Sequence, residues 1–581
     1  MKERLIHEAS FLSHKQHMAS LIIDEAAIKP KCIYDRKSDV VFGIRDKPES
    51  GAPRTKNETL ANRVLCFVLH GVASSYKIPC SYYFTKQLSG RDLYAWTKDV
   101  ISAAEECGFV VIRIVTDNYS ANRTMFKLMG NGSLSTIVKH PHDDERDIFL
   151  SFDPCHVFKN VRSQFLEREL TDGTGVISGT FVQKLYEHQK DMSIKLARNL
   201  TRKHVYPSNL EKMNVLRAVQ VFSPQVTAAL EHLQQNSRVS SLLSTFRDAT
   251  STINFMKVMK KWFDIHDTTY NGSGCKMPIS REDDDRLLWL QNEFCSYVKT
   301  IQECSIATGV GNFTEETYSA LLFSTKSTVE VTRFLLRKGV SYVLTRKFNS
   351  DPIEALFGQL RFMCGGNDAL DARAVTTALD HIVKKKALPS KGVAVQDEDA
   401  EEAAASVPQD VVEELKALKA HLSAPPASVA YSGLVYVGGY LAKLVSDLGC
   451  HACVMLVTTN KTSSPLYKLL SAQENCELHY PKPEFLALLE TISTFFEKAV
   501  KTLPRSKILE ALQLIVEPHL EDSPLLSCPE GVDRSHAKRL AHLISEKFLR
   551  ILLVNYTKKL TDQNDKPSGF THKPTRKHFR L

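Results

Sequence analysis

The 581-residue sequence lacks the features that mark a secreted or membrane-spanning protein. Its first residues are charged and rich in His, without the apolar segment of a secretory leader. No run approaches the roughly 20 apolar residues that a membrane-spanning helix needs. The sequence also has no internal repeat and no Gly-Lys-Ser/Thr element of a P-loop. These absences predict a soluble chain without a membrane partner, and they argue against a P-loop NTPase.

Cysteine is present without a clear pairing pattern. The 13 Cys are scattered and odd in number, which is typical of reduced thiols in the cytosol or nucleus. Cys450 and Cys453 have the spacing of half a zinc site, but no matching second pair lies nearby in the sequence. We therefore favour buried structural thiols over a metal site at this position.

Charge of either sign is only slightly in excess. Lys and Arg total 75 against 66 Asp and Glu, which gives a net charge of +9. The composition is 43% hydrophobic and 24% charged, close to the average of globular proteins, and the length suggests several domains. A basic excess of this size permits an anionic partner such as nucleic acid but does not require one. The position of individual acids is more informative.

The first part of the chain alternates apolar runs with helical patterns. The apolar runs at 21–28 and 40–44 predict an initial β-hairpin, and the run at 109–115 predicts the most apolar strand. Because βαβ crossovers follow this antiparallel start, we predict an α/β fold with a mixed sheet. Further strands and helices are expected at 64–70, 78–84, 90–107, 120–129 and 148–152.

The pattern changes after this sheet. Residues 160–345 are rich in Leu, Lys, Gln and Glu at helical spacing, with almost no strand signal. The predicted segments are a sheet domain (1–158), a helical insertion (159–345), a returning catalytic helix (346–390), an acidic linker (391–410), a helical C-terminal region (411–556) and a basic disordered tail (557–581).

Three acids are candidates for metal chemistry. Asp24 and Asp117 follow apolar strands, and Glu354 lies in the first turn of a predicted helix. Two strand-end carboxylates and one helix carboxylate suit a pair of Mg²⁺ ions that catalyses phosphoryl transfer. Alternatively, Asp351 and Glu354 simply cap their helix, an interpretation that the segment alone leaves open.

Four segments, in order along the chain, resemble P-element-type transposases. They read LIIDEAAIKPKCIYDRKSDVVFG, VTDNYSANRTMFKLMG, FDPCHVFKNVR and KFNSDPIEALFGQLRFMCGGNDALDA. The resemblance covers about residues 15–390 and continues near 431–445. That family has an RNase H-like catalytic domain interrupted by a helical GTP-binding insertion, which accounts for the helical block.

The resemblance implies roles for the three acids. Asp24, Asp117 and Glu354 match the family's catalytic carboxylates, which bind two Mg²⁺ ions. The first and fourth strands of an RNase H-like sheet are neighbours, so Asp24 and Asp117 are expected to meet, and Glu354 to reach them from its helix. Asp153 competes with Asp117 for the second position; the alternative is that Asp153 lies in a loop leading into the insertion.

The resemblance also implies a GTP site. The family uses a Phe-Asp-x-x-Asn segment, in which Phe stacks on guanine and Asp accepts its N–H groups. Phe263 and Asp264 match this segment, whereas Asp267 stands where Asn is expected. Phe263 could instead be a core aromatic residue on a helix. Further nucleotide contacts are implied at Val215, Ser223 and Asp351.

The function implied is that of a transposase core. It would hydrolyse DNA and join transposon ends to target DNA in the nucleus, with GTP as a cofactor that is not hydrolysed, and a homo-oligomer is among its expected partners. We do not recognise the family's zinc-coordinating THAP domain, which favours the alternative of a transposase-derived, non-catalytic DNA- or protein-binding protein. Basic residues that could contact DNA phosphates, or else only solvent, are Lys159, Arg162, Arg202, Lys203, Lys257, Lys260, Lys261, Arg361 and those of the tail.

Overall fold

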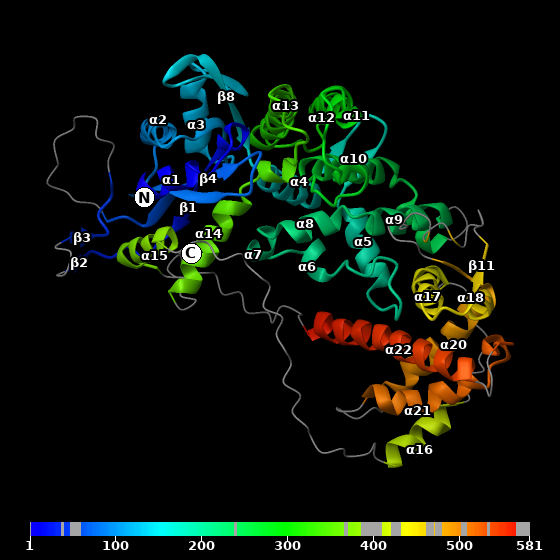
Figure 1. The fold of residues 1–581 in the computed structure, drawn as a ribbon. Helices are drawn as coiled ribbons and strands as arrows, with labels where there is room; N and C mark the ends of the chain where they lie inside the picture. The colour runs from blue at the N-terminus through cyan, green and yellow to red at the C-terminus, as the bar shows by residue number, and fades with distance from the viewer. Residues whose placement is uncertain are drawn as a thin grey trace.

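The structure is a computed structural model of the chain (Figure 1). It describes all residues except 1, 36–39, 47–59, 238–240, 365–369, 385–408, 420–430, 461–466, 468–469, 471–478, 501–507, 531–534 and 565–581. The predicted acidic linker, most of which falls within 385–408, and the Gly-Gly-Asn-Asp-Ala motif at 365–369 therefore lie outside the described residues. No helix in the described part is long and apolar enough to cross a membrane.

A six-stranded mixed sheet forms the first unit, in the order β5-β4-β1-β6-β8-β7. β1 runs antiparallel to β4 and parallel to β6, and β6 runs parallel to β8. This confirms the predicted mixed sheet of an RNase H-like fold. The strands are β1 (Met18–Ala27), β4 (Arg63–Gly71), β5 (Lys77–Thr85), β6 (Val110–Thr116), β7 (Ile137–His140) and β8 (Asp143–Phe152).

The predicted initial hairpin is wrong. β1 takes β4 as its antiparallel partner, because β4 offers nine residues of mostly buried strand. The run at 40–44 instead contributes β3 (Val40–Phe42), which pairs with β2 (Ile33–Asp35) in a separate two-stranded sheet. The polar segment expected as a loop before 148 is also strand, since β8 begins at Asp143 and pairs with β7.

Helices cover both faces of the sheet. α2 (Gly90–Glu106) and α3 (Ser120–Met129) pack on one face, and α14 (Asp351–Met363) and α15 (Ala372–Lys384) pack on the other. The predicted stop of α2 is confirmed at Gly108, whose φ of +98° favours a residue without a side chain. Figure 1 shows α14 beside β1, although about 200 residues of chain separate it from β8.

The intervening block is helical, as predicted, apart from one small hairpin of β9 (Glu169–Thr171) and β10 (Val176–Ser178). Its apolar side chains continue the core of the sheet unit without a break. Its helices of seven or more residues are α4 (Pro154–Glu167), α5 (Thr180–Gln189), α8 (Val215–Val221), α9 (Pro224–Asn236), α10 (Thr250–His266), α12 (Cys295–Thr308) and α13 (Glu315–Arg337).

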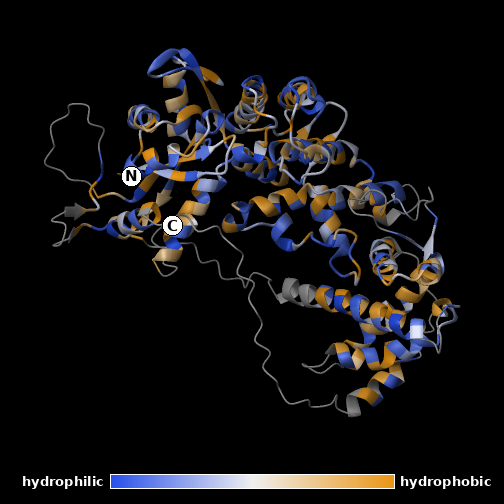
Figure 2. Ribbon diagram, viewed as in Figure 1, coloured by the Kyte–Doolittle hydropathy of each residue, from blue (hydrophilic) through white to orange (hydrophobic). Residues whose placement is uncertain are grey.

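The C-terminal region is a second helical unit with its own core. Figure 2 shows hydrophobic and hydrophilic residues alternating around these helices, as expected when each buries one face. The last helix continues through Asn564, so the prediction of disorder from 557 is wrong for its first eight residues. The helices are α16 (Gln409–Ala417), α17 (Tyr431–Ser446), α18 (His451–Val457), α20 (Pro483–Ala499), α21 (Ile508–Glu521) and α22 (Ser535–Asn564).

Candidate active site

Asp24 lies inside β1, three residues before its end, and Asp117 directly follows the neighbouring parallel strand β6. The pairing of β1 with β6 places Ile22 opposite Val115, two residues before each acid. Since side chains alternate along a strand, each acid faces the same side of the sheet as the residue two positions earlier. Ile22 and Val115 both belong to the apolar cluster under α14. The sheet therefore directs both acids toward the α14 face, as the sequence predicted.

Glu354 comes to these acids on α14. Ile353, Leu356, Phe357 and Leu360 anchor this helix in the same cluster as Ile22 and Val115. The Glu354 side chain is 44% exposed, so it lies at the margin of the packed face. The residues that α14 buries thus hold Glu354 on the face of the sheet where β6 ends beside β1.

The electrostatics of Asp24 indicate that the three acids share one environment. Burial, and after it the charges of Asp117 and Glu354, raise the pKa of Asp24 to about 7 against the opposing charge of His156. Among the described residues, no Lys or Arg forms an ion pair with any of the three acids. The site therefore concentrates negative charge that only a cation or a proton can balance.

Asp117 is oriented by its own neighbours. Its Oδ1 accepts hydrogen bonds from the Tyr119 backbone N–H at 3.0 Å and from Asn122 Nδ2 at 2.5 Å. Asn122 lies in the first turn of α3, so the helix that follows β6 fixes the carboxylate at the strand end. One carboxylate oxygen is held in this way, which leaves Oδ2 for other partners.

Asp153, the competitor for the second acid, has a structural role. It caps the N-terminus of α4, where its Oδ2 accepts the His156 backbone N–H at 2.9 Å. Its Oδ1 accepts the Ser350 backbone N–H at 3.2 Å. Although burial raises the pKa of Asp153, the hydrogen bond and charge of His156 hold it below the ordinary value. Both oxygens are thus engaged in joining α4 to the segment before α14.

His156 is a site residue that the sequence reasoning did not single out. Its Nδ1 lies 2.5 Å from Asp153 Oδ2, and its Nε2 lies 4.0 Å from Glu354 Oε1. Burial lowers the pKa of His156, but the hydrogen bond and charge of Asp153 outweigh this effect and raise it. The sequence did contain a signal for the contact between Asp153 and His156. An Asp at the start of a helix is followed three residues later by a His.

The acids fit a pair of hard divalent cations. The carboxylate oxygens of the three acids are not all within 4.8 Å of one another. In the described part of the chain, a group of Cys and His side chains does meet that separation. Asp24, Asp117 and Glu354 would hold the ions, which would supply Lewis-acid activation of a phosphodiester. Three acids that offer oxygen donors and have no Lys or Arg partner among the described residues match the preference of Mg²⁺ rather than that of a thiolate-binding metal.

The acids implied in GTP binding belong to a charged network. Asp264, in the last turn of α10, lies 2.5 Å from Lys260 Nζ and 3.5 Å from Lys276 Nζ. Asp267 Oδ2 lies 2.6 Å from Lys276 Nζ, and its Oδ1 lies 3.5 Å from Arg346. Arg346 also lies 4.0 Å from Asp351 at the start of α14. The network therefore connects the insertion to the helix that carries Glu354.

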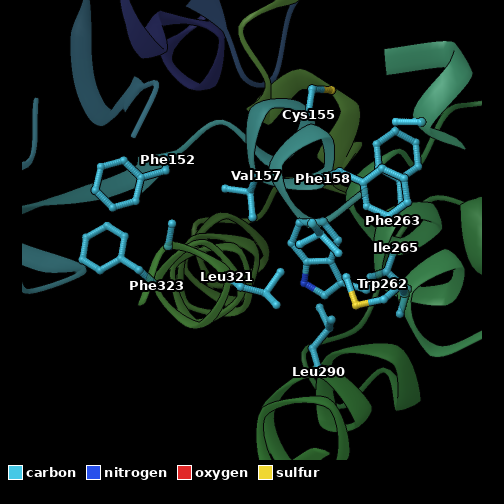
Figure 3. Packing of buried hydrophobic residues seen from close by; sticks show 14 of the residues in the cluster. Phe152, Cys155, Val157, Phe158, Trp262, Phe263, Ile265, Leu290, Leu321 and Phe323 are labelled. Atoms are coloured by element: carbon cyan, nitrogen blue, oxygen red, sulfur yellow. The ribbon is translucent and has the colours of Figure 1, made fainter. Parts of the chain in front are cut away.

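The Phe263 ring is part of the apolar core. It is 5% exposed, and its centroid lies 4.6 Å from that of Phe158 on α4 (Figure 3). This arrangement favours the core interpretation of Phe263 and leaves little of the ring for a base to stack on. Val215 begins α8 and Ser223 precedes α9, and no hydrogen bond or ion pair among the described residues joins either to Asp264 or Asp267.

Two of the basic candidates for phosphate contact are buried. Arg162 is fully buried and donates to the Lys212 carbonyl at 2.7 Å, and Lys159 is 6% exposed. Both expectations are corrected because α4 turns these side chains into the core rather than toward solvent. Arg361 remains exposed on α14, on the same helix as Glu354.

Comparisons with known proteins agree with this geometry. Residues 3–130 match the protein-family model "TNP-like, RNase H N-terminal domain", and residues 155–278 match "TNP-like, GTP-binding insertion domain". The Transposable element P transposase of Drosophila melanogaster is 25% identical over 354 residues, which cover 60% of this chain and 42% of that protein. The DNA transposase THAP9 of Homo sapiens is 22% identical over 543 residues, which cover 87% of this chain and 58% of that protein. The chain thus spans about half the length of these relatives.

A solved structure, the Drosophila P element transposase strand transfer complex, has a similar fold. The TM-score is 0.54 at 21% identity, over 65% of this chain and 80% of that one. The fold is that of an RNase H-like domain interrupted by an insertion that matches the GTP-binding model. By its matched domains and relatives, the chain is similar to the P-element-type transposases.

Proposed function

We propose that this chain is the core of a DNA transposase that hydrolyses phosphodiesters and transfers DNA strands. The observation that carries the proposal is the gathering of Asp24, Asp117 and Glu354 on one face of an RNase H-like sheet, without a Lys or Arg partner among the described residues. Bound divalent cations would supply Lewis-acid activation of the attacking hydroxyl and of the leaving oxygen. In this role the three carboxylates hold the cations.

The neighbouring residues position this set. Asn122 and the Tyr119 N–H hold one oxygen of Asp117, which leaves the other oxygen for a metal. His156, held by Asp153, presents Nε2 toward Glu354 and limits how far that side chain can swing. We propose that exposed Arg361 on the same helix contacts a phosphate of the DNA.

A nicking assay on supercoiled DNA with the purified full chain tests the proposal. We expect Mg²⁺- or Mn²⁺-dependent nicking that falls at least about a hundredfold in Asp24→Asn and Glu354→Gln. Asp99→Asn is the matched control, because this exposed acid lies on α2, on the opposite face of the sheet. Binding of DNA without metal-dependent nicking would favour the alternative of a non-catalytic, transposase-derived DNA-binding protein. Equal nicking by wild type and Asp24→Asn would refute the assignment.

We further propose that the insertion binds GTP without hydrolysing it. Asp264 Oδ1 is buried without a hydrogen bond among the described residues and lies 3.5 Å from Lys276 Nζ, which makes it an acceptor suited to guanine N–H groups. Lys260, Lys276 and Arg346 place cations nearby, and Lys276 and Arg346 offset the charge of Asp267. We also propose that the protein acts in the nucleus. A fluorescent fusion of the chain should then accumulate there.

Titration with a fluorescent GTP analogue, in competition with GTP or ATP, tests nucleotide binding. We expect GTP to compete better than ATP, and Asp264→Asn to weaken binding about tenfold or more. Asp267→Asn restores the neutral amide that the family carries, so it should bind GTP at least as tightly as wild type. Glu187→Gln is the control, since this acid forms an exposed pair with Lys190 elsewhere in the insertion. Equal competition by ATP and GTP would refute the guanine preference.

A further inference from the structure

A group of three cysteines and one histidine lies in the C-terminal unit, far along the chain from the acidic site. The ligand atoms of Cys450, Cys453, Cys528 and His536 all lie within 4.8 Å of one another. The sequence showed only the first two, because 75 residues separate Cys453 from Cys528. Folding supplies the second pair that the sequence spacing could not reveal.

Three different segments carry the four side chains. Cys450 caps the N-terminus of α18, and Cys453 lies in its first turn. Cys528 follows the short 3₁₀ helix Pro524–Leu526, and His536 lies in the first turn of α22. Figure 1 draws α18 within the C-terminal group of helices that includes α20, α21 and α22. The four residues thus meet where a short helix, a loop and the longest helix come together.

The distances match the edges of a zinc tetrahedron. With Zn–S near 2.3 Å and Zn–N near 2.0 to 2.1 Å, a tetrahedral site has S–S edges of about 3.8 Å and S–N edges of about 3.5 Å. The observed Cys450 Sγ–Cys528 Sγ distance is 3.8 Å. His536 Nδ1 lies 3.5 Å from Cys453 Sγ and 3.4 Å from Cys528 Sγ. Three edges therefore have the lengths that a bound zinc ion requires.

The surroundings suit thiolate ligands. The backbone N–H of Cys453 donates to Cys450 Sγ at 3.4 Å, which stabilises negative charge on that sulfur. Glu530 Oε2 lies 3.2 Å from Cys450 Sγ, a contact that requires a protonated thiol. Because Glu530 is exposed, its side chain can turn to solvent when the thiol loses its proton to a metal.

We propose that Cys450, Cys453, Cys528 and His536 form a structural Zn²⁺ site. Four protein ligands complete a tetrahedron and leave no open position for a substrate, and three sulfurs with one imidazole select zinc over Mg²⁺. The ion would fix the start of α22 to α18. α22 also carries Asn555, whose Nδ2 donates to the Ser193 carbonyl of the insertion at 3.3 Å. The site would therefore set the orientation of the helix that joins the two helical units.

Metal analysis of the full chain tests this site. After purification and dialysis against a weak chelator, we expect about one zinc per chain in the wild type and less than about 0.2 in Cys528→Ser and His536→Ala. Cys32→Ser is the control, because Cys32 is exposed and lies far from the group in sequence. Zinc content unchanged in both site variants would overturn the proposal.

Cobalt substitution keeps the test valid if a variant fails to fold. Wild-type protein loaded with Co²⁺ should show thiolate-to-metal charge transfer and the intense d–d bands of tetrahedral coordination. A weak spectrum without charge transfer would place the metal among carboxylates instead and overturn the assignment. Thiol titration of the unfolded, unreduced wild type should count all 13 cysteines, whereas a count of 11 would indicate a Cys450–Cys528 disulfide in place of the metal.

Discussion

Replacing Asp24 by Asn should stabilise the metal-free protein around the active site. In the folded chain burial and the nearby acids raise the pKa of Asp24 to about 7, whereas its ordinary value is 3.8. The folded state therefore binds this proton more tightly than the unfolded state, and stability falls as pH rises from about 4 to about 7. Asn carries no charge at any of these pH values and still offers Oδ1 to the Glu25 N–H, which lies 2.7 Å from Asp24 Oδ1.

The size of the effect follows from the two pKa values. A tenfold change in proton affinity is worth about 1.4 kcal/mol. The Asp24→Asn substitution therefore raises the free energy of unfolding by up to about 4 kcal/mol at pH 8 and by about 2 kcal/mol at pH 5. These are upper values, because side chains and water relax around a buried charge. Near pH 3 the gain vanishes, since the carboxyl is then protonated in both states.

Hydrogen exchange of the β1 and β6 amides measures this change in the local free energy of unfolding. A single midpoint of global unfolding is not well defined for a chain of several units. In EDTA at pH 8, we expect exchange in Asp24→Asn to be slower than in wild type by at least about thirtyfold after correction for intrinsic rates. Added Mg²⁺ should protect wild type and leave the variant unchanged, and Asp99→Asn should behave as wild type. Faster exchange in metal-free Asp24→Asn than in wild type would refute the claim that the buried charge of Asp24 destabilises the metal-free protein.

Three further outcomes follow from the same contacts. Asp153→Ala should lower the local free energy of unfolding by about 2 to 3 kcal/mol, measured by hydrogen exchange of the amides around the substituted residue, because it removes a helix cap and leaves the buried Ser350 N–H without its acceptor. Gly108→Ala should cost about 1 kcal/mol in the same assay, since Gly108 has a φ of +98°. Arg346→Ala should change stability by less than about 1 kcal/mol, because its side chain is 56% exposed, yet calorimetry should show weakened GTP binding.

The strands and helices of the sheet unit were largely predictable because each carries its own periodicity. α3 has the bounds that the sequence predicted, and α2 ends one residue earlier than expected. Strand pairing was not predictable in the same way, because β1 selects its partner by the length and burial of β4 rather than by proximity in sequence. The polar start of β8 was missed because it pairs at the sheet edge, where apolar alternation is not needed.

At the acidic site, too, some features could be predicted from the sequence and others could not. Asp24 and Asp117 were predicted from apolar strands that they were expected to end, and Glu354 was predicted from its helix together with the family resemblance. Asp24 in fact lies inside β1, three residues before its end. Asp153 remained ambiguous because a helix cap and a metal ligand use the same side chain, and only its hydrogen bonds to His156 and Ser350 separate the two roles. The cysteine and histidine group required the fold, since its halves lie on different helices.

The position of Glu354 depends on contacts that cross the insertion. The segment just before α14 is held from the sheet by Arg113, which donates to the Phe348 carbonyl at 2.9 Å. It is held from α4 by Asp153, through the Ser350 N–H. Arg346 then connects the insertion acid Asp267 to Asp351 at the start of α14. If the proposed nucleotide drew Arg346 toward its phosphates, it would remove one of these restraints on the helix that carries Glu354.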